Sequence, residues 1–173
     1  EHGGSSGSEW LKTTLKTMRI YNFENTEDSD VSVDEVFMRE ALKLAHTAEL
    51  EEEIPIGAVI VSQGKIIGKG YNLTERLHDV TAHAEMQAFT AASNFMGGKY
   101  LKNCTLYVTI EPCVMCAGAS FWSQISRVVY GARDEERGAS NFGNLYHPKT
   151  EVTAGILEAE CAELIKSFFR NKR

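Results

Sequence analysis

Two short motifs contain the residue types of a catalytic metal site. The first, His83-Ala84-Glu85, supplies an imidazole and a carboxylate, and the second, Pro112-Cys113-Val114-Met115-Cys116, supplies two thiols. A zinc ion that performs chemistry takes three protein ligands and keeps its fourth position for water, while a nearby base moves protons. His83, Cys113 and Cys116 meet the first requirement and Glu85 the second. The motifs therefore predict a catalytic zinc site.

The elements around the motifs must bring them together. Thr81 is a good N-cap for a helix over residues 82–95, and Pro112 suits the first position of the helix that continues over residues 114–123. Both motifs would then lie at helix N-termini, where backbone N–H groups and the helix dipole favour a thiolate. Glu85 is two residues from His83, a rotation of about 200° on a helix. We expect it to border the open metal position and to act as general acid and base.

Other interpretations of the cysteines stay open. A Cys-x-x-Cys pair also occurs in redox dithiols and as half of a structural zinc site. A redox dithiol does not require His-x-Glu upstream, and a closed structural site requires a fourth ligand. Neither Cys104 nor Cys161 has supporting spacing, and we expect both to be small buried side chains. A noncatalytic, zinc-stabilised binding module remains the alternative from another functional class.

The amino-acid composition indicates a soluble domain in a reducing compartment. The chain has 173 residues, of which 43% are hydrophobic and 24% charged, and it contains no apolar run near the ~20 residues that span a bilayer. No stretch resembles a secretory signal. The net charge of −6 argues against an electrostatic nucleic-acid binder as a whole, yet the last eight residues carry four basic groups and no acid. We expect no association with membranes.

Three segments divide the chain. Residues 1–8 look like the remnant of an affinity tag and linker, and residues 9–32 form an extension whose role the sequence does not indicate. Residues 33–173 are expected to form one domain.

Helices alternate with strands in the predicted domain after an opening hairpin. Ser32 and Glu35 form a capping-box pattern that begins the first helix. The predicted helices span residues 33–52, 82–95, 114–123 and 157–170, and the predicted strands span residues 56–62, 65–71, 105–110 and 127–131. This alternation is typical of a mixed sheet covered by helices on both faces, so the fold class is α/β.

The two motifs match the signature of zinc deaminases that act on nucleobases. Four runs extend the match, and they resemble bacterial tRNA-specific adenosine deaminases of the cytidine and deoxycytidylate deaminase superfamily: residues 81–85, 111–119, 131–134 and 168–170. The resemblance covers about residues 33–173. It implies a three-layer α/β/α fold like that of cytidine deaminase, with a central sheet of about five strands.

The resemblance also implies a reaction. In that family, zinc generates a hydroxide that attacks C6 of adenine, and adenosine at the wobble position of a tRNA anticodon loop becomes inosine. Carried over to this chain, one Zn²⁺ per subunit would be bound by His83, Cys113 and Cys116, with Glu85 as the proton shuttle. The partners would be a tRNA anticodon stem-loop and a second copy of the chain, in the cytoplasm.

Residues that would contact the substrate follow from the same resemblance. Asn72 and Ala84 match positions at the base pocket, and Phe168, Phe169 and Arg170 match C-terminal contacts to the anticodon loop. Each also has a plain structural interpretation. Asn72 could simply close a strand, two Phe on an amphipathic helix are often core residues, and a basic helix end is favoured by its own dipole.

Departures from the family pattern leave the metal motif intact. Val80 replaces the usual Pro before the metal helix, Trp122 stands where many members have His, and the segment over residues 141–149 is shorter than in some members. The substrate is encoded less specifically than the metal site. Deamination of a free base or nucleoside, of the guanine or cytidine type, is therefore the second enzymatic hypothesis.

Overall fold

The structure is a computed structural model that describes residues 31–173. The predictions for residues 1–8 and for nearly all of residues 9–32 lie outside the described residues. Within residues 31–173 no helix is both long and apolar enough to cross a membrane.

A five-stranded mixed sheet forms the centre of the domain, in the order β2-β1-β3-β4-β5. The strands are β1 (Gly57–Ser62), β2 (Lys65–Tyr71), β3 (Cys104–Ile110), β4 (Arg127–Ala132) and β5 (Glu151–Ala154). β1 is antiparallel to both β2 and β3, whereas β3, β4 and β5 are parallel to one another. The expected mixed sheet is confirmed, although β5 was not among the predicted strands.

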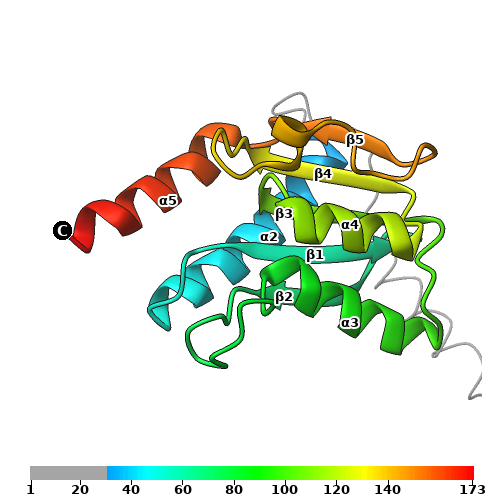
Figure 1. Cartoon of the computed structure of the whole chain (residues 1–173), viewed down its shortest axis with the longest axis horizontal. Coiled ribbons are helices and arrows are strands. Elements are labelled where there is room, and N and C mark those ends of the chain that lie inside the picture. The colour runs from blue at the N-terminus through cyan, green and yellow to red at the C-terminus, as the bar shows by residue number, and fades with distance from the viewer. Residues whose placement is uncertain (1–30) are drawn as a thin grey trace, which may run out of the picture. The chain divides into compact units, whose positions relative to one another are not determined.

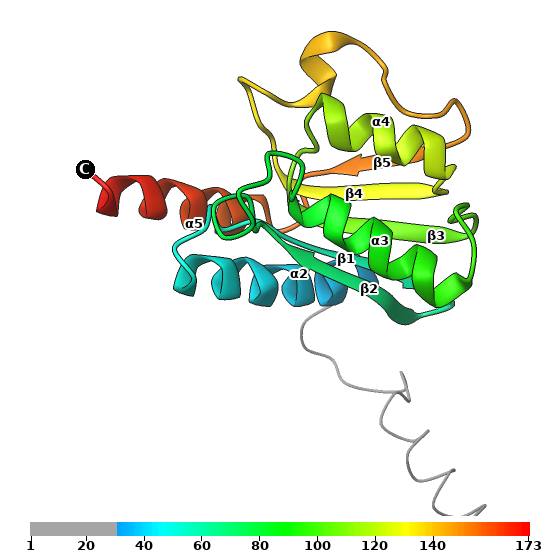
Figure 2. The ribbon, with the colours of Figure 1, turned by 60° about the horizontal axis from the view of Figure 1, so that its bottom comes forward.

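Helices cover both faces of the sheet (Figures 1 and 2). α3 (Ala84–Met96) and α4 (Val114–Ser123) lie on one face, and α2 (Val33–Leu50) and α5 (Glu158–Asn171) lie on the other. A short 3₁₀ helix, η2 (Ala139–Phe142), follows β4. The arrangement is the three-layer α/β/α fold expected from the sequence.

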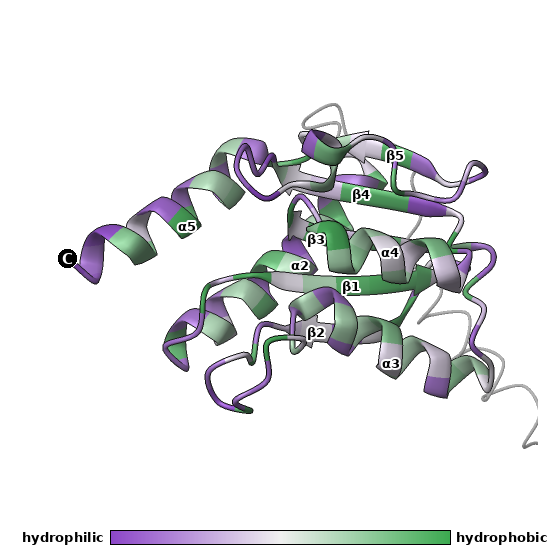
Figure 3. Cartoon of the chain, viewed as in Figure 1, coloured by the Kyte–Doolittle hydropathy of each residue, from purple (hydrophilic) through white to green (hydrophobic). Residues whose placement is uncertain are grey.

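Alternation along the strands builds a separate core on each face. Ile60 and Val108 face α3, whereas Val59 and Tyr107, which are paired across β1 and β3, face α2. Complete burial of one such aliphatic side chain contributes about 1.5–3 kcal/mol to folding. In Figure 3 the middle of β4 is hydrophobic, and the loop between β2 and α3 is largely hydrophilic. That loop leads directly into the first motif, His83-Ala84-Glu85.

α2 begins where the sequence predicted and ends two residues earlier. Ser32 Oγ accepts a hydrogen bond from the backbone N of Glu35 at 3.2 Å, which confirms the N-terminal cap. The helix ends at Leu50 because Glu52 takes a left-handed conformation (φ 62°) and the backbone N of Glu53 turns back to Ala48 O at 2.9 Å. This turn sends the side chain of Glu53 into the interior.

Candidate metal and substrate site

Both metal-binding motifs lie at one edge of the sheet. β2 and β3 are each antiparallel to β1, so they run in the same direction and end at the same edge. α3 follows β2 after a loop, and α4 follows β3 after two connecting residues and its cap, Cys113. The topology therefore brings His83 beside two cysteines that come 30 and 33 residues later in the chain.

The helix after the first motif begins at Ala84, with His83 as an extended N-cap. The prediction that Thr81 caps this helix is wrong. The backbone N and hydroxyl of Thr81 donate instead to Asp79 Oδ1, at 2.8 and 2.7 Å, and so close a separate turn before the helix. The imidazole therefore extends from the helix end, where the dipole is positive.

The second helix spans Val114–Ser123 as predicted, but its N-terminus differs in one respect. Pro112 is not its first residue, because Cys113 is the extended N-cap and Val114 begins the helix. The carbonyl of Pro112 accepts a hydrogen bond from the backbone N of Ala139 at 2.9 Å. Cys113 thus lies at the cap and Cys116 in the first turn, so both thiols face the positive end of the helix dipole.

Gly70 allows α3 to lie directly on β2. A Cβ atom at this position would lie 2.2 Å from the carbonyl oxygen of Ala84, the first residue of α3. Only a residue without a side chain permits this approach. The backbone contact fixes the distance between the sheet and the helix end that carries His83.

The donor atoms fit a zinc ion. Cys113 Sγ and Cys116 Sγ lie 3.7 and 3.6 Å from His83 Nδ1, and the three atoms all lie within 4.8 Å of one another. Zn–S bonds of about 2.3 Å and a Zn–N bond of about 2.0 Å in a tetrahedron place sulfur and nitrogen roughly 3.5 Å apart. Nitrogen and sulfur are also the donors that zinc prefers. Residues 31–173 contain no other group of at least three candidate metal-binding side chains.

Hydrogen bonding among the donors favours a thiolate. The hydrogen bond with Cys116, together with that from His83, lowers the pKa of Cys113 to about 3. The same contact raises the pKa of Cys116, since one proton shared between two sulfurs stays on the more buried one. The hydrogen bond with Cys113 also raises the pKa of His83. A divalent cation would relieve this shared protonation by replacing the protons.

Glu85 has the properties of a proton shuttle. It is the second residue of α3, and its side chain is almost completely buried. Burial raises the pKa of its carboxyl to about 7, although the charge of His83 opposes the shift. A group that is half protonated near neutral pH can both take and return a proton during one reaction cycle.

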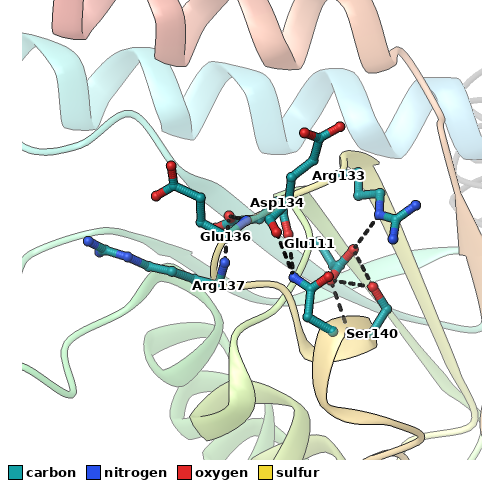
Figure 4. A network of polar contacts seen from close by, with 8 residues as sticks. Glu111, Arg133, Asp134, Glu136, Arg137 and Ser140 are labelled. Carbon is teal, nitrogen blue, oxygen red and sulfur yellow. Dashed lines mark hydrogen bonds and ion pairs between the residues drawn. The ribbon is translucent and has the colours of Figure 1, made fainter.

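A second buried carboxylate, Glu111, is hydrogen-bonded to the segment that follows β4 (Figure 4). Glu111 accepts hydrogen bonds from the backbone N and hydroxyl of Ser140 at 3.1–3.2 Å, and Arg133 Nε lies 4.0 Å from it. Gly138 forms an isolated bridge with Cys113, and a Cβ there would lie 1.8 Å from Glu111 Oε2. Sequence reasoning did not identify Glu111 as a site residue. The one signal was an acidic residue directly before Pro112.

Asn72 lies at the end of β2 and is buried. Its backbone N donates to Ile56 O at 3.1 Å, and its side-chain Nδ2 donates to Glu53 Oε2 and Thr74 Oγ1, both at 3.4 Å. Glu53 is completely buried and was also missed in the sequence. The backbone N of Leu73 donates to Ala82 O at 3.0 Å, so the loop after Asn72 returns directly to the first motif.

The structure separates the three C-terminal candidates. Phe168 is buried, with Lys172 Nζ 4.6 Å from the centre of its ring. Phe169 is 48% exposed, and Arg170 is exposed and pairs with Glu163. Of the two rings, only that of Phe169 is available to an unpaired base in this conformation.

Two of the three departures from the family pattern, Val80 and Trp122, lie at the surface. Val80 and Trp122 are exposed by 84% and 78%, and the segment over residues 141–149 contains the exposed side chain of Phe142. Tyr146 in that segment is half-buried, and its hydroxyl has no hydrogen-bond partner among the described residues. None of these residues belongs to the donor set.

Comparisons with known proteins agree with this geometry. The family model of the cytidine and deoxycytidylate deaminase zinc-binding region matches residues 31–132. The tRNA-specific adenosine deaminase of Bacillus subtilis is 44% identical over 146 residues, which are 81% of this chain and 91% of that protein. The chain belongs to this zinc-dependent deaminase family. The match to the chloroplastic tRNA(adenine(34)) deaminase of Arabidopsis thaliana, at 42% identity, covers 80% of this chain but 12% of that protein.

Solved structures of deaminases share the fold. A structure from a study of A-to-I editing by tRNA:A34 deaminases is 40% identical with a TM-score of 0.70, and the match covers 75% of this deaminase and 98% of that chain. The guanine deaminase of Bacillus subtilis is 38% identical with a TM-score of 0.56, and the match covers 64% and 69% of the two chains. The fold is thus common to deaminases with different substrates.

Proposed function

We propose that this deaminase converts adenosine to inosine at the wobble position of a tRNA anticodon loop. The overall reaction consumes water and releases ammonia. The observation that carries the chemistry is the buried carboxyl of Glu85 beside the three-donor set of His83, Cys113 and Cys116. The choice of substrate is supported by the similarity to tRNA-specific adenosine deaminases over most of the chain.

The side chains divide the chemical work. His83, Cys113 and Cys116 would hold one zinc ion, which, when bound, supplies a water activated for hydrolysis at neutral pH. Glu85 accepts a proton as the C6–O bond forms, and it delivers a proton to the amino group as the C6–N bond breaks. Because its carboxyl is buried, the proton stays at the reacting centre instead of passing to bulk water.

A surface cleft of about 360 Å³ has Phe169 in its lining and would receive part of an extended substrate outside the metal site. It lies between the ends of the central strands, the loop after β4 and the C-terminal half of α5, and Ile56, Ile110 and Phe169 contribute apolar lining. Three basic and three acidic side chains also line it: Arg133, Arg137, Lys166, Asp134, Glu135 and Glu136. With these charges balanced, we expect stacking on Phe169 to contribute more than net charge to RNA binding.

We also propose that the chain forms a homodimer and acts in the cytoplasm. Trp122, Phe95 and Phe142 are exposed large hydrophobic side chains, a kind of surface that a protein partner would cover. The four cysteines are free, which suits a reducing compartment.

A free base such as guanine is the second candidate substrate. The observation in its favour is the 38% identity to a solved guanine deaminase with the same fold. Because one scaffold serves both reactions, zinc binding alone does not distinguish them.

Ammonia release distinguishes the candidates directly. The full chain would be incubated with adenosine, guanine, cytidine and an anticodon stem-loop carrying adenosine at the wobble position. We expect release from the stem-loop with one equivalent of inosine formed per ammonia, and little release from the free compounds. Release from guanine or cytidine without reaction of the stem-loop would overturn the proposal.

A further inference from the structure

Glu53 is a completely buried carboxylate whose hydrogen-bond partners are all donors from one short segment. The backbone N of Arg76 donates to Oε1 at 2.7 Å, and the backbone N of Glu75 and Asn72 Nδ2 donate to Oε2 at 3.2 and 3.4 Å. Its own backbone is fixed to the end of α2 by the bond to Ala48 O. Glu53 therefore connects a rigid helix end to the segment that begins at Asn72.

The carboxylate of Glu53 determines the orientation of the Asn72 side-chain amide. An ionised carboxylate only accepts hydrogen bonds, so the amide nitrogen must face Glu53 and the carbonyl oxygen must face away. Thr74 Oγ1 accepts from the same nitrogen at 3.4 Å. If the amide were flipped, Asn72 Oδ1 would face an oxygen of Glu53 without a proton between them, which is strongly unfavourable in a buried position.

The carbonyl oxygen of Asn72 remains available. It has no hydrogen-bond partner among residues 31–173. In this part of the chain the fully buried side-chain nitrogen and oxygen atoms without a partner are Arg127 Nε and Tyr146 Oη, so the Asn72 oxygen is not fully buried. Its side of the amide is therefore open, although the residue as a whole is 4% exposed. An accessible acceptor on a buried side chain can select a ligand that carries a donor.

We propose that Glu53 is a positioning residue that turns the amide of Asn72 so that its carbonyl oxygen, and not its NH₂ group, faces the substrate. The site then selects a nucleoside that offers a hydrogen-bond donor at this point. Adenosine in RNA offers its ribose hydroxyls as donors away from the reacting C6, whereas a free base carries no ribose. This inference rests on the proposed function, because it assigns Asn72 to the substrate pocket.

A swap of donor and acceptor tests the orientation. Glu53→Gln introduces an NH₂ group that no longer forces the amide to point one way, and Asn72→Asp places two carboxylates against each other. We expect each single variant to lower kcat/KM on the stem-loop roughly tenfold or more, the effect of one misplaced hydrogen bond. The double variant restores a donor facing an acceptor, so it should regain a large part of the activity that Asn72→Asp loses. Glu51→Gln is the matched control, since Glu51 bonds Tyr71 and Arg76 but not Asn72.

A spectroscopic readout separates this inference from the proposed function. In a ¹⁵N-edited NMR spectrum of the free protein, the side-chain NH₂ signals of Asn72, assigned by their loss in Asn72→Asp, should shift in Glu53→Gln and stay in place in Glu51→Gln. Unchanged signals in Glu53→Gln, or a double variant no more active than Asn72→Asp, would overturn the inference. Wild-type protein that forms no inosine would overturn the proposed function and leave the NMR result to decide the orientation.

Discussion

Cys116 Sγ lies 3.6 Å from Nδ1 of His83, although the two residues lie at the N-termini of different helices, which follow different strands. The contact depends on β2 and β3 ending at one edge of the sheet. The metal site is thus a property of the topology, and the helix starts supply the electrostatics that favour it.

Removal of one donor should remove the metal. In Cys116→Ser the weaker oxygen ligand replaces a thiolate, so we expect zinc content by mass spectrometry to fall from about one ion per chain to roughly a tenth of that or less. Cys104→Ser is the control, because Cys104 lies outside the donor set and its thiol donates to Lys102 O at 3.5 Å, a bond that a hydroxyl can also make. Equal zinc content in the two variants would contradict the donor set.

Gly138 should not tolerate a side chain. Gly138→Ala would place a Cβ 1.8 Å from the carboxylate of Glu111, so we expect a loss of about 1–3 kcal/mol in the free energy of unfolding, measured by urea denaturation. A Cβ added at Gly118 in α4 would meet no atom within 4 Å. Gly118→Ala should therefore stabilise the helix by about 0.5–1 kcal/mol. A Gly138→Ala variant as stable as the wild-type chain would argue against the close contact at Gly138.

The two C-terminal phenylalanines should behave differently. Phe169→Ala removes a half-exposed ring, and we expect weaker binding of the anticodon stem-loop, equivalent to about 1–3 kcal/mol, with little change in stability. Phe168→Ala removes a buried ring and should cost about 3–5 kcal/mol of folding free energy. Filter binding and thermal unfolding measure the two effects. Loss of binding in a folded Phe168→Ala variant, with none in Phe169→Ala, would reverse the assignment.

Asp34 and Arg127 should make stability depend on pH. Arg127 Nη1 lies 2.7 Å from Asp34 Oδ1, and this contact lowers the pKa of Asp34. A lowered pKa means that the stabilisation is complete above the usual Asp value of about 3.9 and is lost as the pH falls through the native-state value. Arg127→Met should therefore cost about 1.5–3 kcal/mol at pH 7 and less at pH 3.

Arg39→Met provides the comparison for that pair. Arg39 pairs with Glu160 at 3.1 Å, but both side chains are about half exposed, so we expect a cost of less than about 1 kcal/mol. Urea unfolding of both variants at pH 7 and pH 3 measures the two losses in the free energy of unfolding. A cost for Arg127→Met that does not change between pH 7 and pH 3 would contradict the role assigned to Asp34.

The sequence predicted the donor set and the alternation of elements because both are short-range patterns. The start of α3 was misplaced by two residues, since the side chain of Asp79 binds Thr81 and the metal-binding residue His83 is itself the cap. β5 was missed because three of its four residues are exposed and so lack an apolar pattern. Its pairing comes from the neighbouring strand β4.

The buried carboxylates could not be predicted from local sequence. Glu53 belongs to an acidic run that resembles a solvated surface, and its burial depends on the turn after α2 and on donors more than 18 residues away. By contrast, the burial of Phe168 can be predicted from the sequence. Cys161, Leu164 and Phe168 follow the helical spacing of a buried stripe, and Phe169 lies outside it.

Glu85→Ala tests the central claim, that this carboxyl moves the protons of a hydrolytic deamination without holding the metal. The measurement is inosine formation in an anticodon stem-loop with adenosine at the wobble position, made together with the zinc content of the same sample. We expect about one zinc per chain and no measurable inosine from Glu85→Ala, under conditions in which the wild-type chain converts the substrate completely. Inosine formation at the wild-type rate by Glu85→Ala would contradict it.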